Sequence, residues 1–196
     1  MGKLPLTLAG AIGGGGAAAA GGYSIYSAIQ PKTIKEKLLK EGFSLISDIK
    51  DSDKSNAAWE KTVSRYKVEA DGNSKINSDN ISSITKDKIS KWCEENLGSK
   101  IEEALYSKAS KWCVAFTSLE EKLKQSGRQL QTNAQTLNGK YDSIPQDIKG
   151  KINSVSVTAS SNQNGEKIKQ WCSDLSKRAF TNEKDSHYQN LISHCI

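Results

Sequence analysis

Residue types that carry much protein chemistry are scarce in this chain of 196 residues. It has two histidines, and its three arginines, Arg65, Arg128 and Arg178, lie far apart in the sequence. Nucleic-acid grooves need clustered arginines with interleaved aromatic residues, so the sequence predicts no nucleic-acid partner. It also lacks a Gly-rich phosphate loop and a nucleophile elbow. We therefore predict no catalytic or cofactor-binding residues, no enzyme activity and no small-molecule substrate.

Proline is scarce too, with three widely spaced residues, whereas Lys, Glu, Leu, Ala and Gln are common. This balance favours helices over a sandwich or a barrel. Hydrophobic residues make up 36% of the chain and charged residues 26%, a lean composition that is still globular. Lysine and acid alternate along most of the chain, which is typical of solvated helix faces. The net charge is +6.

Charge is absent between Lys3 and Lys32. A helix needs roughly 20 apolar residues to cross a bilayer, and this stretch is long enough. We predict that residues 1–30 form a signal or transmembrane segment, which contacts the membrane through residues 4–29. A run of alanines resembles a signal-peptidase site. Two outcomes therefore stay open: secretion after cleavage at Ala20, or retention as a single anchor.

The side of the membrane is a second open question. Lys32, Lys35, Lys37 and Lys40 follow the segment, whereas only Lys3 and the amino terminus precede it. Counting these charges places the rest of the chain in the cytoplasm. The signal-like layout and the even number of cysteines favour export. We expect an extracellular head at the cell membrane.

The two halves of the chain resemble each other. The segment TIKEKLLKEGFSL, from Thr33, aligns without gaps with SLEEKLKQSGRQL, from Ser118. Further matches follow in the same order: Lys75-Ile76-Asn77-Ser78 with Lys151-Ile152-Asn153-Ser154, Trp92-Cys93 with Trp171-Cys172, and the Tyr106 to Cys113 spacing with the Tyr188 to Cys195 spacing. Trp59 has no counterpart in the second half. We predict two tandem, sequence-related helical modules, residues 31–114 and 115–196.

Three of the four cysteines directly follow a tryptophan, and helical spacing places them on apolar stripes. We therefore expect the cysteines on buried faces, with Trp92, Trp112, Trp171, Tyr106 and Tyr188 as packing landmarks. The predicted stripes are Ile89, Trp92, Cys93 and Leu97; Ile101, Ala104, Leu105, Ala109, Trp112, Cys113 and Phe116; Ile168, Trp171, Cys172, Leu175 and Ala179; and Tyr188, Leu191, Ile192 and Cys195.

Four cysteines allow three disulfide connectivities, or they can remain buried thiols. The pairing that respects the duplication joins Cys93 to Cys113 and Cys172 to Cys195. Each bridge would close a loop of about 20 residues and stabilise the fold by roughly 3 kcal/mol. The sequence alone leaves the other connectivities open.

Cys172, His187, His194 and Cys195 are zinc-type ligands near the end of the chain. Their spacing matches no finger or ribbon pattern, and the first half has Leu105 and Trp112 where the second has the two histidines. We predict no metal site. Each cysteine also lies on an apolar stripe, which makes an activated thiol nucleophile unexpected.

The chain resembles the paralogous families of uncharacterised membrane-anchored or surface proteins of haemotropic mycoplasmas. The resemblance rests on the hydrophobic start and on KLLKEGFSLI, WEKTVSRYK, KWCVAFTSLEEKL and WCSDLSKRAF. The chain departs from the pattern in its closing His194-Cys195 and in lacking a partner for Trp59. The resemblance implies a surface protein with a role in host contact or antigenic variation, and it carries over no catalytic or binding residue.

The sequence thus predicts a mainly α-helical protein in which an N-terminal hydrophobic segment precedes two related helical modules. Gly42 and Gly127 are expected to end helices. The predicted function is surface-displayed and non-catalytic, with a host-cell surface component as partner and with recognition by the exposed loops DGNSKINSDN and TASSNQNG. The alternative is a cytoplasmic-facing structural protein tethered to the membrane.

Overall fold

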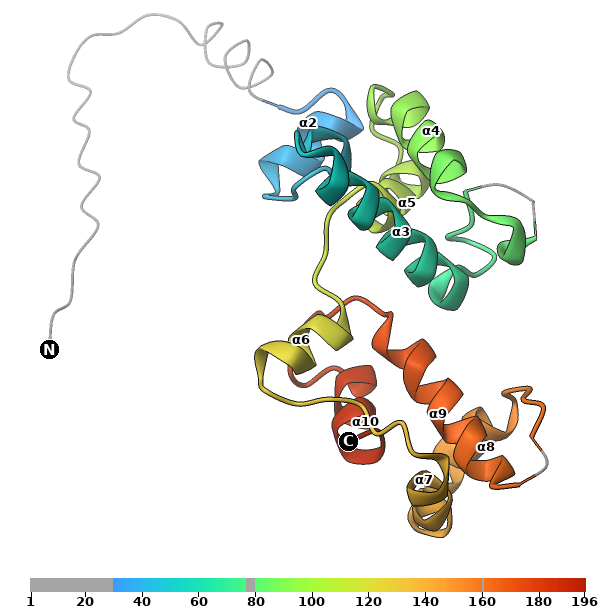
Figure 1. The fold of residues 1–196 in the computed structure, drawn as a ribbon. Helices are drawn as coiled ribbons and strands as arrows, with labels where there is room; N and C mark the ends of the chain where they lie inside the picture. The colour runs from blue at the N-terminus through green and yellow to red at the C-terminus, as the bar shows by residue number, and fades with distance from the viewer. Residues whose placement is uncertain (1–29, 77–79, 160) are drawn as a thin grey trace, which may run out of the picture. The chain divides into compact units, whose positions relative to one another are not determined.

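The structure, a computed structural model, describes residues 30–76, 80–159 and 161–196. These residues are mainly helical, as predicted (Figure 1). Within these ranges extended backbone pairs only at isolated bridges. The α-helices are α2 (Ile34–Lys40), α3 (Ser52–Glu69), α4 (Lys86–Leu97), α5 (Glu103–Trp112), α6 (Leu119–Gln125), α7 (Ala134–Lys140), α8 (Gln146–Asn153), α9 (Gln163–Ser176) and α10 (Ser186–His194), and the 3-10 turns are η1 (Ile46–Asp48), η2 (Ile81–Ser83) and η3 (Tyr141–Ser143).

The predicted signal or transmembrane segment lies, except for its last residue, outside the described residues. Among the helices that are described, none combines the length and the apolar character needed to cross a membrane.

Two separate hydrophobic clusters form the interior. The first runs from Ile34 to Val114 and draws on α2 to α5. Tyr66 and Trp112 lie inside it with ring centroids 4.8 Å apart. The second runs from Leu119 to Cys195 and draws on α6 to α10. The boundary between them falls between 114 and 119, where the sequence places the junction of the two halves.

Each cluster opens with a short helix that begins in a capping box. The Thr33 hydroxyl accepts from the Glu36 amide at 3.2 Å, and the Glu36 carboxylate accepts from the Thr33 amide. Ser118 and Glu121 exchange the same two bonds at the start of α6. Such caps satisfy backbone amides that have no partner within the helix.

The same two helices end at the glycines that the sequence predicts. Gly42 has a φ of +86° and Gly127 a φ of +71°, the left-handed region that glycine enters without steric cost. The turn lets the amide of Phe43 donate to the Leu38 carbonyl, and that of Arg128 to Leu123, each at 3.0 Å. Both helices therefore stop with their last carbonyls satisfied.

Two backbone hydrogen bonds recur at matching places in the two halves. The Ile34 amide donates to the Ser99 carbonyl at 3.0 Å, and the Leu119 amide to Arg178 at 2.9 Å. Further on, the Ile46 amide donates to the Cys113 carbonyl, and the Gln131 amide to Cys195. In each half these bonds tie the first helix and the segment after it to the segments that follow the last two helices.

The middle of each half differs. The first half has one 18-residue helix, α3, which carries Trp59. The second half has α7, η3 and α8 instead, with Pro145 directly before α8. Lys75 and Ile76 lie outside helices, whereas Lys151 and Ile152 belong to α8, so this pair of aligned motifs differs in local structure.

Four members of the predicted stripes are placed differently by the structure. Ile101 precedes α5 and Phe116 follows it, Ala179 follows α9, and Ala104 is exposed on α5. For Ile101, Phe116 and Ala179 the helical periodicity does not hold, because these residues lie beyond the ends of the helices. A small alanine fits either face of a helix, so it marks the buried side only weakly.

Candidate functional site

The cysteines form the two disulfides that respect the predicted duplication. Cys93 and Cys113 join α4 to the end of α5, and Cys172 and Cys195 join α9 to the end of α10. All four are at most 1% exposed, so the predicted burial of the cysteines is confirmed. The described residues include no free cysteine.

The tryptophan and tyrosine landmarks divide into buried and half-buried residues. Trp112, Trp171 and Tyr188 are buried in the clusters. Trp92 and Tyr106 pack against the first cluster from its edge. Tyr106 does more than pack, because its hydroxyl donates to Glu41 and Lys37 lies 3.8 Å above its ring. Burial, together with the contact with Glu41, raises the pKa of Tyr106 to about 12.

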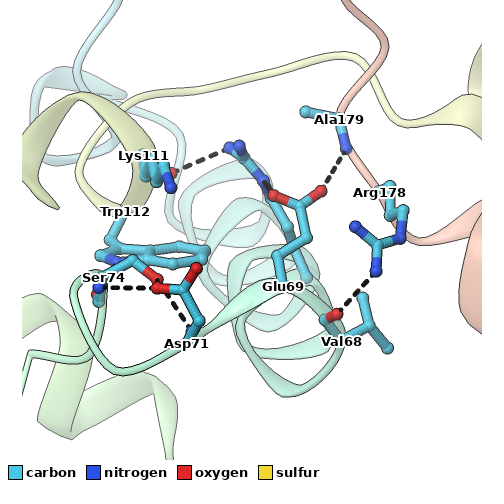
Figure 2. A network of polar contacts seen from close by, with 9 residues as sticks. Val68, Glu69, Asp71, Ser74, Lys111, Trp112, Arg178 and Ala179 are labelled. Atoms are coloured by element: carbon cyan, nitrogen blue, oxygen red, sulfur yellow. Dashed lines mark hydrogen bonds and ion pairs between the residues drawn. The ribbon is translucent and has the colours of Figure 1, made fainter. Parts of the chain in front are cut away.

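The carboxyl-terminal end of α3 is the meeting point of several polar contacts (Figure 2). The Arg65 Nε donates to the Glu69 carboxylate at 2.9 Å, and Nη1 donates to the Lys111 carbonyl at 2.9 Å. Only 11% and 15% of the two paired side chains are exposed. The guanidinium also lies over the rings of Trp112 and Phe116. Arg65 therefore fastens α3 to the end of α5.

The same end of α3 is bound by the segment after α9. Arg178 Nη2 donates to the Val68 carbonyl at 3.0 Å, and the Ala179 amide donates to the second carboxylate oxygen of Glu69 at 3.0 Å (Figure 2). Arg178 thus satisfies one of the carbonyls left open at a helix end, where a cation is also favoured by the helix dipole.

A tight turn follows α3 and supports the first cluster. Asp71 accepts from the Ser74 amide at 3.0 Å and from its hydroxyl at 2.8 Å. These bonds from Ser74 hold the pKa of Asp71 below its usual value. The Ser74 carbonyl then accepts the Trp112 indole N–H at 2.7 Å, and the Tyr66 hydroxyl accepts the Ile76 amide. The turn therefore supplies hydrogen-bond partners to two buried aromatic side chains.

Beside this meeting point lies a cleft of about 360 Å³. Its walls come from the end of α3 and from α8, α9 and α10, so residues from both halves of the chain line it. Val68, Trp171 and Leu175 give the cleft an apolar part. Its volume falls in the range of small-molecule binding sites.

The polar part of the cleft is mainly cationic. Lys67, Lys151 and Arg178 line it, and none of the three has a carboxylate partner among the described residues. The carboxylate in the wall is Asp174, which accepts from Lys177 at 2.8 Å and from the Gln170 amide at 3.1 Å. Its charge is therefore already balanced by a neighbouring lysine.

His187 and Asn190 complete the lining on α10. The His187 side chain is about half exposed and lies 3.3 Å from the Asp185 carboxylate. Burial opposes ionisation of Asp185, but bonds from Thr181 and from the amides of His187 and Tyr188 outweigh it and lower its pKa. A fixed anion thus holds the first turn of α10 and presents His187 and Asn190 to the cleft.

The link between the halves carries a further ion pair. Lys61 donates to the Glu121 carboxylate at 3.0 Å and contacts the Phe116 carbonyl. Burial opposes ionisation of Glu121, but its bonds from Ser118 and Lys61 outweigh burial and lower its pKa. Glu121 therefore serves both the capping box of α6 and a contact to α3.

Arg65 and Arg178 are far apart in the sequence, which predicts no arginine cluster, yet both bind the end of α3. The spacing of Arg65 and Glu69, four residues apart on a helix, was the available signal. The side chain of Arg178 and the amide of Ala179 bind Val68 and Glu69, each 110 positions away, and no local pattern indicates these contacts.

The two loops predicted to carry recognition are partly structural. In DGNSKINSDN, Ser74 and Ile76 are buried, and residues 77–79 lie outside the described ranges. In TASSNQNG, Gly165 is a buried residue of α9, and residue 160 lies outside those ranges. Their free surface is therefore smaller than the polar sequence indicates.

The zinc-type residues at the end of the chain do not converge. Cys172 and Cys195 are bonded to each other, and His194 lies beside Trp171 with ring centroids 6.4 Å apart. No group of three or more His, Cys, Asp or Glu side chains suited to a metal ion occurs in the described part of the chain.

Comparison with known proteins identifies no relative of this chain. No protein-family model, no curated protein and no solved structure matches the chain.

Proposed function

We propose that this chain is a membrane-anchored or secreted surface protein that binds a partner and catalyses no reaction. The observation that carries the proposal is the pair of buried disulfides, one in each hydrophobic cluster. Stable disulfides are characteristic of oxidising compartments outside the cytoplasm. The uncharged segment before Lys32 supplies the targeting or anchoring step.

We further propose that residues 31–114 and 115–196 are two copies of one ancestral module. The capping boxes at Thr33 and Ser118, the two left-handed glycines, the recurring backbone bonds and the two disulfides support this origin. The different middle segments, α3 against α7 and α8, are where the copies diverged. Duplication would have produced a surface between the modules on which a binding site can form.

The resemblance to haemotropic mycoplasma families makes a host-cell surface component the expected partner, with host contact or antigenic variation as the role. A cytoplasmic-facing structural protein is the second candidate. Its support is the lysine cluster directly after the uncharged segment, because basic residues flanking a membrane segment favour the cytoplasm.

Labelling of intact cells separates the two candidates. A membrane-impermeant amine reagent should modify exposed lysines such as Lys40 and Lys50 if the head is outside. Mass spectrometry without reduction should then recover the peptides linked through Cys93–Cys113 and Cys172–Cys195. Unlabelled lysines together with four free thiols would contradict the surface proposal and favour the cytoplasmic tether.

A further inference from the structure

We propose that the cleft between α3 and α9 binds a small ligand through an oxyanion, that is a sulfate, phosphate or carboxylate group. Three cationic side chains, Lys67, Lys151 and Arg178, share one cavity without a carboxylate partner among the described residues. Other lysines, such as Lys108 and Lys184, also form no ion pair with the described residues, so the distinguishing feature is that three such cations line one cleft.

The carboxylates near the cleft are already occupied. Asp174 is held by Lys177, and Glu69 accepts from Arg65 and from the Ala179 amide. Arg178 uses one nitrogen for the Val68 carbonyl, which fixes the guanidinium at the cleft wall. A planar guanidinium fixed in this way has further N–H groups suited to the paired oxygens of an oxyanion.

The rest of the lining suits the body of such a ligand. Trp171 and Leu175 provide an apolar wall, and His187 and Asn190 provide hydrogen-bonding groups. A volume of about 360 Å³ accommodates one or two rings and is small for a polymer groove. The chemistry therefore fits an acidic sugar or a simple inorganic oxyanion, held without being converted.

This inference specifies a ligand for the proposed binding function, and it rests on that function only in assuming that the chain is a binding protein. Oxyanion binding in the cleft is expected whether the head lies outside the cell or in the cytoplasm. If the cleft binds no oxyanion while intact-cell labelling places the head outside, the cleft inference fails alone and the surface proposal stands.

The test uses the full chain in a neutral detergent, with the indole resonance of Trp171 as readout, assigned by Trp171→Phe. Sodium sulfate, sodium phosphate and glucuronate are titrated at constant ionic strength, with glucose as the neutral control. We expect a saturable shift with the anions and none with glucose. A stronger response to glucuronate supports an acidic sugar, and a stronger response to sulfate or phosphate supports the free ion.

Two double variants make the test specific. K67Q/K151Q removes two exposed cleft cations, and we expect roughly tenfold weaker binding, the effect of losing charged hydrogen-bond donors at a partly open site. K40Q/K50Q removes the same charge at exposed lysines that do not line the cleft, and we expect less than a twofold change. No saturable shift, equal losses in both variants, or an equal response to glucose would overturn the proposal.

Discussion

At the residue scale, Gly165 is the one described glycine at which an added β-carbon would collide with neighbouring atoms. A β-carbon at this residue would lie 1.8 Å from the Ala134 carbonyl oxygen, and the nearest atoms are all backbone atoms of α7. Backbone cannot rotate aside as a side chain can, so α7 and α9 would have to separate. Their close approach depends on the missing side chain at this position.

We predict that Gly165→Ala lowers the free energy of unfolding by about 3 kcal/mol, near the upper end of the usual cost of overpacking. Gly150 is the matched control, because it lies on helix α8 with open space around it. Gly150→Ala should stabilise by about 0.5 to 1 kcal/mol through helix propensity. Urea unfolding of both variants measures the difference. A tolerated Gly165→Ala would contradict the contact between α7 and α9.

His194 gives the molecule a residue-level response to pH. Burial lowers its pKa below 6.5, Asp147 opposes this shift, and Lys140 adds to it. The native state therefore binds this proton less readily than the unfolded state. The associated stability is complete above about pH 6.5 and is lost as the pH falls through the lower folded pKa.

We predict that His194→Gln flattens the fall in melting temperature between pH 7.5 and 5. The reason is that the neutral amide has no proton to gain in the unfolded state. His187→Gln is the control, since that side chain is about half exposed beside Asp185. Thermal unfolding across this pH range gives the comparison. Parallel curves for the wild type and His194→Gln would show that another group sets the acid limit.

At the element scale, the charge pair on α3 has an exposed counterpart with the same spacing. Arg65 and Glu69 are 11% and 15% exposed, whereas Lys91 and Glu95, also four residues apart, are 76% and 59% exposed. A buried pair that loses one partner leaves an uncompensated charge out of water. An exposed pair leaves a charge that water still solvates.

We predict that Arg65→Met costs about 3 kcal/mol of unfolding free energy, whereas Lys91→Met costs less than about 0.5 kcal/mol. The double variant R65M/E69M should recover part of the loss, because it removes the stranded carboxylate. Chemical denaturation of the three variants measures this. Equal costs at Arg65 and Lys91 would mean that the pair on α3 is solvated as freely as a surface pair.

The two helix ends at Gly42 and Gly127 could be predicted from the sequence, because a glycine in the left-handed region acts only on its neighbours. The capping boxes of Thr33 with Glu36 and of Ser118 with Glu121 are equally local, but the sequence analysis did not predict them. The split of the second middle segment into α7 and α8 depends on tertiary packing as well as on Pro145, which cannot continue a helix. Alignment with the first half did not indicate this change.

At the scale of the whole molecule, two clusters with one disulfide each predict two separable unfolding events. The loops closed by Cys93–Cys113 and Cys172–Cys195 span 20 and 23 residues. Removing either bridge should cost about 3 kcal/mol. We predict that C93S/C113S lowers the melting temperature of the first cluster and C172S/C195S that of the second.

Differential scanning calorimetry of these variants, with the reduced wild type as reference, makes the assignment. The two serine variants should each shift one component of the transition and leave the other in place. A single transition that moves as a whole in both variants would mean that the contacts at Arg65, Glu69 and Arg178 couple the clusters into one unit.

The observed disulfide pairing was the one favoured by the sequence, because the similarity of the two halves assigns two cysteines to each half, although the sequence alone left the other connectivities open. The cleft could not be predicted from the sequence, because Lys67, Lys151 and Arg178 belong to three helices or helix ends that are distant in sequence. Each looks like an ordinary surface cation until the fold places it beside the others. Net charge and alternation of charge along the chain contain no information about that convergence.

The two disulfides also set how far the chain lengthens under tension. If the two ends of the described chain are pulled apart, the force acts on all the helices between them. The 20 residues closed by Cys93–Cys113 correspond to about 70 Å of extended chain, and the 23 closed by Cys172–Cys195 to about 80 Å. Both lengths stay sequestered while the bonds are intact. In an oxidising medium the protein would therefore extend little under force. A reductant that breaks the disulfides would add the length of the two loops to the extended chain.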